Sequence, residues 1–144
     1  GIEWVRRCLG DEYRVHELKF KDQSAMHIDA TFVPLAPGKV LIHPDKVDKV
    51  PEMFKNWDVL KAPESNIPDS HPLYMCSKGV RVNVLSLDEK RVIVEKQDEP
   101  TIKALKDFGF EPILCNFRNF NTFGGSFHCA TMAVRRRGEL QSYF

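Results

Sequence analysis

The sequence predicts an α/β fold built from ββαβ units. The main observation is a repeat: the order strand, amphipathic helix, strand occurs between residues 39 and 60 and recurs between residues 91 and 114. A second observation is that each of these stretches is preceded by another apolar, strand-like stretch and a turn. One ββαβ unit that occurs twice predicts neighbouring units that pack against each other around a common axis.

The first unit is expected between residues 28 and 60. Pro37 and Gly38 separate two strand-like stretches and therefore predict a turn between antiparallel strands. The helix is short and amphipathic. The expected strands cover 28–33, 39–42 and 57–60, and the expected helix covers 51–55.

The second unit has the clearer helix signals. Pro100 lies in the first turn of the expected helix, where proline is tolerated, and Gly109 lies where a helix C-cap is expected. Residues 88–90 supply the turn between the first two strands. The expected strands cover 80–87, 91–94 and 110–114, and the expected helix covers 99–108.

Both ends of the chain look like parts of further units. Residues 1–9 have a helix-like pattern, and residues 13–20 are interpreted as the last strand of a preceding unit. A strand over 129–134 would open a third unit. The chain is therefore expected to contain half a unit, two whole units and the start of another.

Composition excludes several function classes. The 144 residues suit one globular domain, and the 21 basic residues are balanced by 20 acidic ones that are interspersed with them. This balance gives no broad positive electrostatic potential that would attract nucleic acid or anionic lipid. No apolar stretch reaches the length of a membrane span. The four cysteines include no CxxC pair, which argues against a zinc knuckle or a disulfide scaffold and favours a reducing compartment.

The candidate functional residues lie at equivalent places in successive units. His27, the pair Cys76 and Ser77, and the pair His128 and Cys129 all fall just before, or at the start of, the first strand of a unit. If the units pack around a common axis, these segments converge and line one central pocket. In contrast, Cys8 and Cys115 are expected to be inert packing residues, and His43 to be a surface group.

The spacing leaves three roles open for Cys129: nucleophile, metal ligand or small buried side chain. Gly124 and Gly125 would allow the backbone to approach a ligand closely. Neighbouring residues on a strand point to opposite faces, so His27 is a better base for Cys129 than His128. The same geometry argues against a metal ion shared by His128 and Cys129.

His27 and Asp29 are two residues apart and are expected on the same face of an extended strand. A carboxylate and an imidazole presented together suit a cationic nitrogenous substrate. The carboxylate can bind a guanidinium group while the imidazole moves protons. A surface His–Asp pair without function is the alternative interpretation.

Several long motifs resemble the arginine:glycine amidinotransferase family, and the similarity runs over the whole chain. The motifs are MHIDATF at 26–32, SHPLYMCSKG at 70–79, NVLSLDEKRV at 83–92, GGSFHC at 124–129 and VRRRGELQSYF at 134–144. The resemblance also extends to amidinotransferases of guanidino-toxin biosynthesis. It implies a pseudo-fivefold α/β propeller of ββαβ modules, of which residues 1–144 would be the incomplete C-terminal part.

The resemblance also implies a reaction. Cys129 would attack the guanidinium carbon of L-arginine, and His27 would move the protons. Ornithine would leave, and an acceptor amine, such as glycine or a toxin-pathway amine, would take the amidino group from the cysteine. The substrate-binding residues implied by the resemblance are Met26, Asp29, Lys46, Cys76 and Ser77.

The chain departs from the glycine-specific animal enzyme at positions that bear on the acceptor. Lys46 replaces an arginine that grips the substrate carboxylate, which keeps the charge but loses the bidentate fork, and Cys76 replaces a serine. The family's triad acid would lie upstream of residue 1. Two alternatives are an arginine deiminase-like hydrolase that keeps Cys129, His27 and Asp29, and an inert partial propeller.

The resemblance completes the expected list of partners. It implies that the protein uses no metal and no organic cofactor. Its expected partners are small-molecule substrates, without nucleic acid and without a membrane span. A homodimer is kept open as the assembly. The expected location is the cytoplasm, or the mitochondrion if the protein comes from an animal-type pathway.

Overall fold

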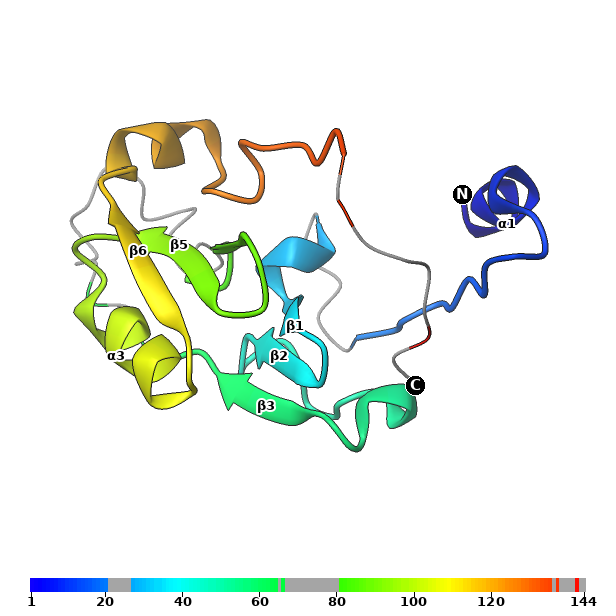
Figure 1. The fold of residues 1–144 in the computed structure, drawn as a ribbon, viewed down its shortest axis with the longest axis horizontal. Helices are drawn as coiled ribbons and strands as arrows, with labels where there is room; N and C mark the ends of the chain where they lie inside the picture. The colour runs from blue at the N-terminus through cyan, green and yellow to red at the C-terminus, as the bar shows by residue number, and fades with distance from the viewer. Residues whose placement is uncertain (21–26, 65, 67–80, 136, 138–141, 143–144) are drawn as a thin grey trace.

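The computed structural model describes residues 1–20, 27–64, 66, 81–135, 137 and 142, and these contain two three-stranded sheets (Figure 1). The first sheet has the order β1 (Phe32–Ala36), β2 (Lys39–Ile42), β3 (Asp58–Lys61). Strands β1 and β2 are antiparallel, and β2 and β3 are parallel. A 3-10 turn, η2 (Glu52–Phe54), lies in the connection between β2 and β3, where the sequence predicted a short helix.

The second sheet repeats this topology. Its strands are β4 (Leu85–Ser86), β5 (Arg91–Glu95) and β6 (Glu111–Cys115). β4 and β5 are antiparallel, β5 and β6 are parallel, and the helix α3 (Glu99–Asp107) connects the parallel pair. The predicted repeat of two units with the order strand, strand, helical segment, strand is therefore confirmed.

Local sequence signals explain how the elements start and stop. Gly38 has φ 77° in the turn between β1 and β2, a conformation that favours glycine. The side chain of Asp98 accepts a hydrogen bond from the Thr101 N–H and caps the start of α3, with Pro100 in the first turn. Gly109, with φ 93°, follows the end of the helix as predicted.

Four of the strand predictions are wrong in extent or in type. β1 begins at Phe32 rather than residue 28, because Ile28–Ala30 forms a 3-10 turn, η1. β4 covers only Leu85–Ser86, and the described residues of 13–20 form no strand. Over 129–134 the chain continues from a turn without forming a strand.

The N-terminal helix α1 (Ile2–Leu9) forms as predicted but buries none of its residues. Cys8 is therefore exposed, and the packing role expected for it is wrong. Cys115, for which the same role was expected, is partly buried. His43 was expected at the surface, but it is 2% exposed at the end of β2. None of the described helices is long and apolar enough to cross a membrane.

The two units share one hydrophobic core. Buried residues of both sheets and of α3 form a single cluster: Val33, Leu35, Leu41, Ala62, Val82, Val84, Val92, Val94, Leu105 and Phe110. Lys39 of β2 reaches across to the second unit, where its Nζ donates to the Phe108 carbonyl at 2.6 Å and lies 4.8 Å from the centre of the Phe108 ring. This packing fixes the segments that precede β1 and β4 relative to each other.

Candidate active site

His27, Asp29 and Cys129 come together although they lie on distant segments. One ligand atom of each lies within 4.8 Å of those of the other two. His27 has an extended backbone directly before η1, which carries Asp29, and Cys129 lies in a turn after η3 (Arg118–Phe123). The prediction that these three side chains converge is confirmed, although Asp29 lies on a 3-10 turn rather than on a strand.

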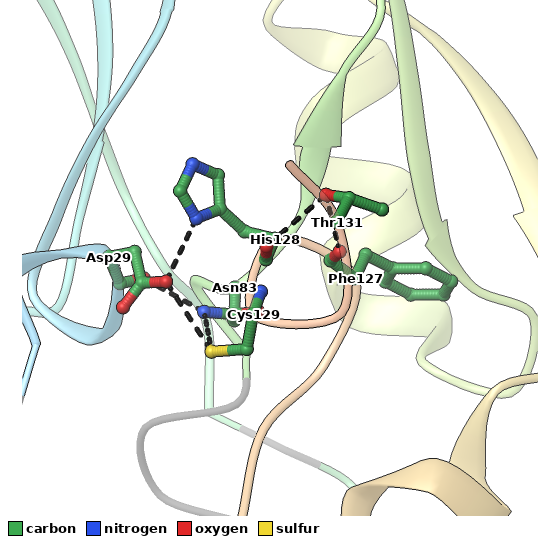
Figure 2. A network of polar contacts seen from close by, with 6 residues as sticks. All are labelled: Asp29, Asn83, Phe127, His128, Cys129 and Thr131. Atoms are coloured by element: carbon green, nitrogen blue, oxygen red, sulfur yellow. Dashed lines mark hydrogen bonds and ion pairs between the residues drawn. The ribbon is translucent and has the colours of Figure 1, made fainter. Parts of the chain in front are cut away.

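The turn that carries Cys129 is held by internal hydrogen bonds, and the residues before Cys129 are buried. The Ala130 N–H donates to the Ser126 carbonyl at 3.0 Å, and the Thr131 hydroxyl donates to the Phe127 carbonyl at 3.0 Å. Ser126 and Phe127 are buried, whereas Cys129 is exposed. The cysteine is therefore exposed on a turn that hydrogen bonds hold in place. Figure 2 shows the Thr131 bond beside Cys129.

Gly125 makes room for the cysteine. A Cβ atom added at Gly125 would lie 2.6 Å from the Cys129 Cβ and 3.1 Å from its Sγ, which is closer than van der Waals contact allows. The sequence suggested that the glycine pair lets the backbone approach a ligand. In the structure, the group that approaches Gly125 is the Cys129 side chain itself.

Asp29 is the common partner of His128 and Cys129. The Nδ1 atom of His128 lies 2.9 Å from Asp29 Oδ2, and the Cys129 thiol donates to the same oxygen at 3.4 Å (Figure 2). The expectation that His128 and Cys129 point to opposite faces is wrong, because they lie in a turn and not in a strand. The sequence placed His128 at the expected pocket but directed its side chain away from Cys129, so the contact of both residues with Asp29 was not predicted.

Asn83 is a member of the cluster that sequence reasoning missed. Its side-chain carbonyl accepts the Cys129 backbone N–H at 3.2 Å, and its amide donates to the Cys129 Sγ at 3.1 Å. The same amide nitrogen lies 3.5 Å from the Asp29 carbonyl oxygen. In the sequence, Asn83 opens the motif NVLSLDEKRV and was expected inside the first strand of the second unit, and neither feature assigned it to the site. In the structure it lies shortly before β4, much as Asp29 lies shortly before β1.

Burial and hydrogen bonds together shift two pKa values in opposite directions. Burial acts to raise the pKa of Asp29, but the hydrogen bonds from His128, Cys129 and Asn83 outweigh it and lower the pKa. Burial raises the pKa of the Cys129 thiol, and the neighbouring Asp29 carboxylate raises it further. The cluster therefore contains an ionised carboxylate beside a protonated thiol.

One oxygen of this carboxylate remains available. Asp29 Oδ1 is buried and has no hydrogen-bond partner among the residues that the structure describes. The Asp29 side chain is only 13% exposed, so water can compensate little for the missing partner. An N–H donor from a ligand, above all a cationic one, would satisfy this oxygen.

The cluster also has the donor atoms of a metal site. The imidazole of His27, the carboxylate of Asp29 and the thiol of Cys129 could together hold an ion such as zinc. The sequence argument against a metal relied partly on His128 and Cys129 pointing apart, and the structure removes that part; the absence of a CxxC pair is unchanged. The expectation that the protein uses no metal stays a prediction.

The other predicted substrate-binding residues are not tested by the geometry. Lys46 lies in the turn after β2 and is partly buried; its N–H donates to the His43 carbonyl at 3.1 Å. Its role toward a substrate stays a prediction. Met26, Cys76 and Ser77 lie outside the described residues.

The comparisons with known proteins point to one family of enzymes. No protein-family model matches the chain. The chain is 64% identical over 143 residues to the L-arginine:L-lysine amidinotransferase of Pseudomonas savastanoi pv. phaseolicola, and the match covers 99% of this chain and 40% of that protein. It is 49% identical over 146 residues to the mitochondrial glycine amidinotransferase of Gallus gallus, covering 100% of this chain and 35% of that protein.

A solved structure agrees with these matches. An amidinotransferase from Microseira wollei in the saxitoxin biosynthetic pathway is similar with a TM-score of 0.91 and 55% identity, covering 100% of this chain and 43% of that chain. The chain thus spans less than half the length of each of these relatives.

Proposed function

We propose, because the homologues of this chain are amidinotransferases, that it carries the nucleophile of an enzyme that transfers an amidino group from L-arginine to an acceptor amine. The observation that carries the proposal is the convergence of Cys129, His27 and Asp29 within 4.8 Å. These groups supply what the reaction needs at one place: a sulfur nucleophile, an imidazole to move protons, and a carboxylate for the guanidinium.

Arginine binding would use the carboxylate oxygen that lacks a partner. The guanidinium N–H groups would donate to Asp29 Oδ1, which is buried and unpaired within the described part of the chain. The positive charge would also reverse the local electrostatics around Cys129. A cation beside the thiol offsets the Asp29 charge that raises its pKa, so substrate binding itself favours the thiolate.

The first half-reaction would load the cysteine. The Cys129 thiol passes its proton to His27, and the thiolate forms a bond to the guanidinium carbon of arginine. The bond between that carbon and the side-chain nitrogen of arginine then breaks, and this nitrogen takes a proton from His27. Ornithine leaves as the free amine, and an amidino group remains on the sulfur.

The second half-reaction would regenerate the thiolate. His27 removes a proton from the incoming amine, whose nitrogen forms a bond to the amidino carbon. The bond between carbon and Cys129 sulfur breaks, and the product carries the guanidino group. No electrons are lost or gained in either step, so the reaction needs no redox partner.

The acceptor is the least determined part of the proposal. The relatives' names give L-lysine and glycine as acceptors for two of them, and the third acts in the saxitoxin pathway. Lys46 would hold the carboxylate of an amino-acid substrate as a point charge, and Cys76 and Ser77 would contribute to the same pocket. We propose an amine of one of these classes: glycine, L-lysine or a toxin-pathway amine.

The architecture beyond the described units is part of the proposal. Two successive units with one topology and a shared core support a larger ring of such units, the pseudo-fivefold α/β propeller, to which residues 1–144 would contribute one part of a single domain. A homodimer remains the proposed assembly.

The test is to incubate the protein that carries this chain with arginine and, separately, with glycine, L-lysine and neutral amines. The expected products are ornithine and the guanidino derivative of one acceptor, and Cys129→Ala should produce neither. Formation of citrulline without acceptor would show a deiminase-like hydrolase instead. Absence of arginine turnover with every amine, in a protein that is folded by circular dichroism, would contradict the proposed function.

A further inference from the structure

Asn83 differs from the other residues of the cluster because it is both deeply buried and in contact with the reacting sulfur. Asn83 is 2% exposed, and its neighbours Val82 and Val84 are buried in the core shared by the two units. A buried amide of this kind must satisfy its donors and acceptor within the protein. Asn83 does so with Cys129 and Asp29.

The orientation of the amide is fixed by the backbone. The Cys129 N–H can only donate, so the atom 3.2 Å from it must be the Asn83 carbonyl oxygen. The amide nitrogen then necessarily faces the sulfur, at 3.1 Å, and the Asp29 carbonyl, at 3.5 Å. One side chain thus ties the loop that carries the cysteine to the turn that carries the carboxylate.

We propose that Asn83 positions Cys129 for attack and stabilises its thiolate form. An N–H donor directed at sulfur favours the negative form, since a thiolate is a much stronger acceptor than a thiol. Asn83 therefore acts against Asp29, whose carboxylate favours the protonated form. The proposal rests on the proposed function of Cys129 as the nucleophile, but it can be measured without turnover.

The first measurement is the rate at which iodoacetamide alkylates Cys129, followed by peptide mass spectrometry as a function of pH in the protein that carries this chain. Asn83→Asp keeps the size of the side chain and an acceptor for the Cys129 N–H, but it replaces the donor with a carboxylate oxygen. We expect alkylation at pH 7 to slow by roughly tenfold, because a rise of about one unit in the thiol pKa lowers the thiolate fraction about tenfold. Asn83→Ala should move the profile in the same direction.

Asn121→Ala is the matched control. Asn121 is also buried, at 4% exposure, but its side chain does not contact Cys129 among the described hydrogen bonds. Its alkylation profile should coincide with that of the unmodified protein. A profile for Asn83→Asp that also coincides with it would overturn the proposal, and thermal unfolding of each variant shows that the comparison is made on folded protein.

The second measurement is turnover. With Asn83→Asp we expect kcat to fall at least tenfold, while the KM for arginine changes little because Asp29 keeps its side chain. If the unmodified protein does not convert arginine at all, the proposed function fails, yet the alkylation profiles still decide the role of Asn83. If the unmodified protein converts arginine but the alkylation profiles of Asn83→Asp and the unmodified protein coincide, the proposed role of Asn83 is wrong while the proposed function stands.

Discussion

Burial and Asp29 together favour the protonated form of Cys129 before substrate binds. One oxygen of the Asp29 carboxylate contacts both His128 and the Cys129 thiol. Burial is the largest cause of the raised thiol pKa, and the Asp29 carboxylate adds to it. The resting cysteine is thus held in its unreactive form, which protects an exposed thiol from alkylation and oxidation. Arginine would supply the positive charge that releases this restraint.

We predict that Asp29→Asn makes the free protein more reactive and the enzyme less active. Removing the charge lowers the pKa of Cys129, so iodoacetamide should alkylate it roughly threefold to tenfold faster at pH 7. Arginine use should fall by a hundredfold or so, because the guanidinium loses its charged partner. Slower alkylation in this variant would contradict the electrostatic account, and unchanged arginine use would make Asp29 structural.

Gly125 is predicted to be required for activity rather than for stability. An alanine Cβ would collide with Cys129, so Gly125→Ala should displace the sulfur and reduce kcat at least tenfold. Gly124→Ala is the informative comparison, since Gly124 has φ 86° and alanine there should cost about 1–2 kcal/mol in the free energy of unfolding. Kinetics and thermal unfolding of both variants check this. An active Gly125→Ala would show that the loop relaxes.

The sequence was sufficient to predict that His27 and Cys129 meet, because equivalent positions of repeated units converge, and it placed Asp29 beside His27. It was not sufficient for the direction of the His128 side chain or for the role of Asn83. Period-two alternation placed His128 on the wrong face, since a tight turn does not follow that rule. Asn83 acquires its role only through contacts made between units, which no local pattern describes.

At the level of elements, the strands next to helices were predicted best. β2, β5, α3 and β6 lie within one or two residues of their predicted ranges, because apolar runs, Pro100 and Gly109 define them locally. The opening strands were predicted too early. Ile28–Ala30 forms a 3-10 turn, and residues 81–84 form a turn and an irregular stretch, so neither segment pairs in a sheet.

Helix α3 offers a test of its N-cap. Asp98 is buried and accepts from the Thr101 N–H, so Asp98→Ala should lower the free energy of unfolding by about 1 kcal/mol. Burial raises the pKa of Asp98, more than the Thr101 hydrogen bonds lower it. The charged form is thus disfavoured in the folded state, and stability falls as pH rises from the ordinary aspartate pKa through the folded one.

Asp98→Asn separates the cap from the charge. Asparagine keeps the acceptor oxygen, so this variant should be at least as stable as the unmodified protein at pH 7, and the difference should vanish at acidic pH, where Asp98 is neutral. Thermal melts across the acidic range check the sign. An asparagine variant less stable than the alanine variant would contradict both parts of the argument.

At the scale of the molecule, the site depends on the packing of one unit against the next. Asp29 precedes the first sheet, Asn83 precedes the second, and the core that fixes them contains residues of both sheets. Lys39 adds a polar link, because its ammonium group donates to the Phe108 carbonyl and lies over the Phe108 and Phe110 rings.

We predict that Lys39→Met lowers the free energy of unfolding by about 1–2 kcal/mol, since methionine keeps the apolar stem but loses the hydrogen bond and the cation–π contacts. Lys103→Met is the matched control, because Lys103 makes an exposed ion pair with Asp107 on α3, and its loss should cost a few tenths of a kcal/mol. Chemical denaturation measures both. Equal effects would show that the link between units contributes nothing.

The central claim is that Cys129 receives the amidino group of arginine, and the most direct test omits the acceptor. The protein that carries this chain is incubated with L-arginine alone, quenched in acid and digested, and its cysteine peptides are weighed by mass spectrometry. The account predicts one amidino group on the peptide that contains Cys129, one ornithine released per adduct, and neither in Cys129→Ser. Ornithine release without an adduct on Cys129, or an adduct on another cysteine, would contradict it.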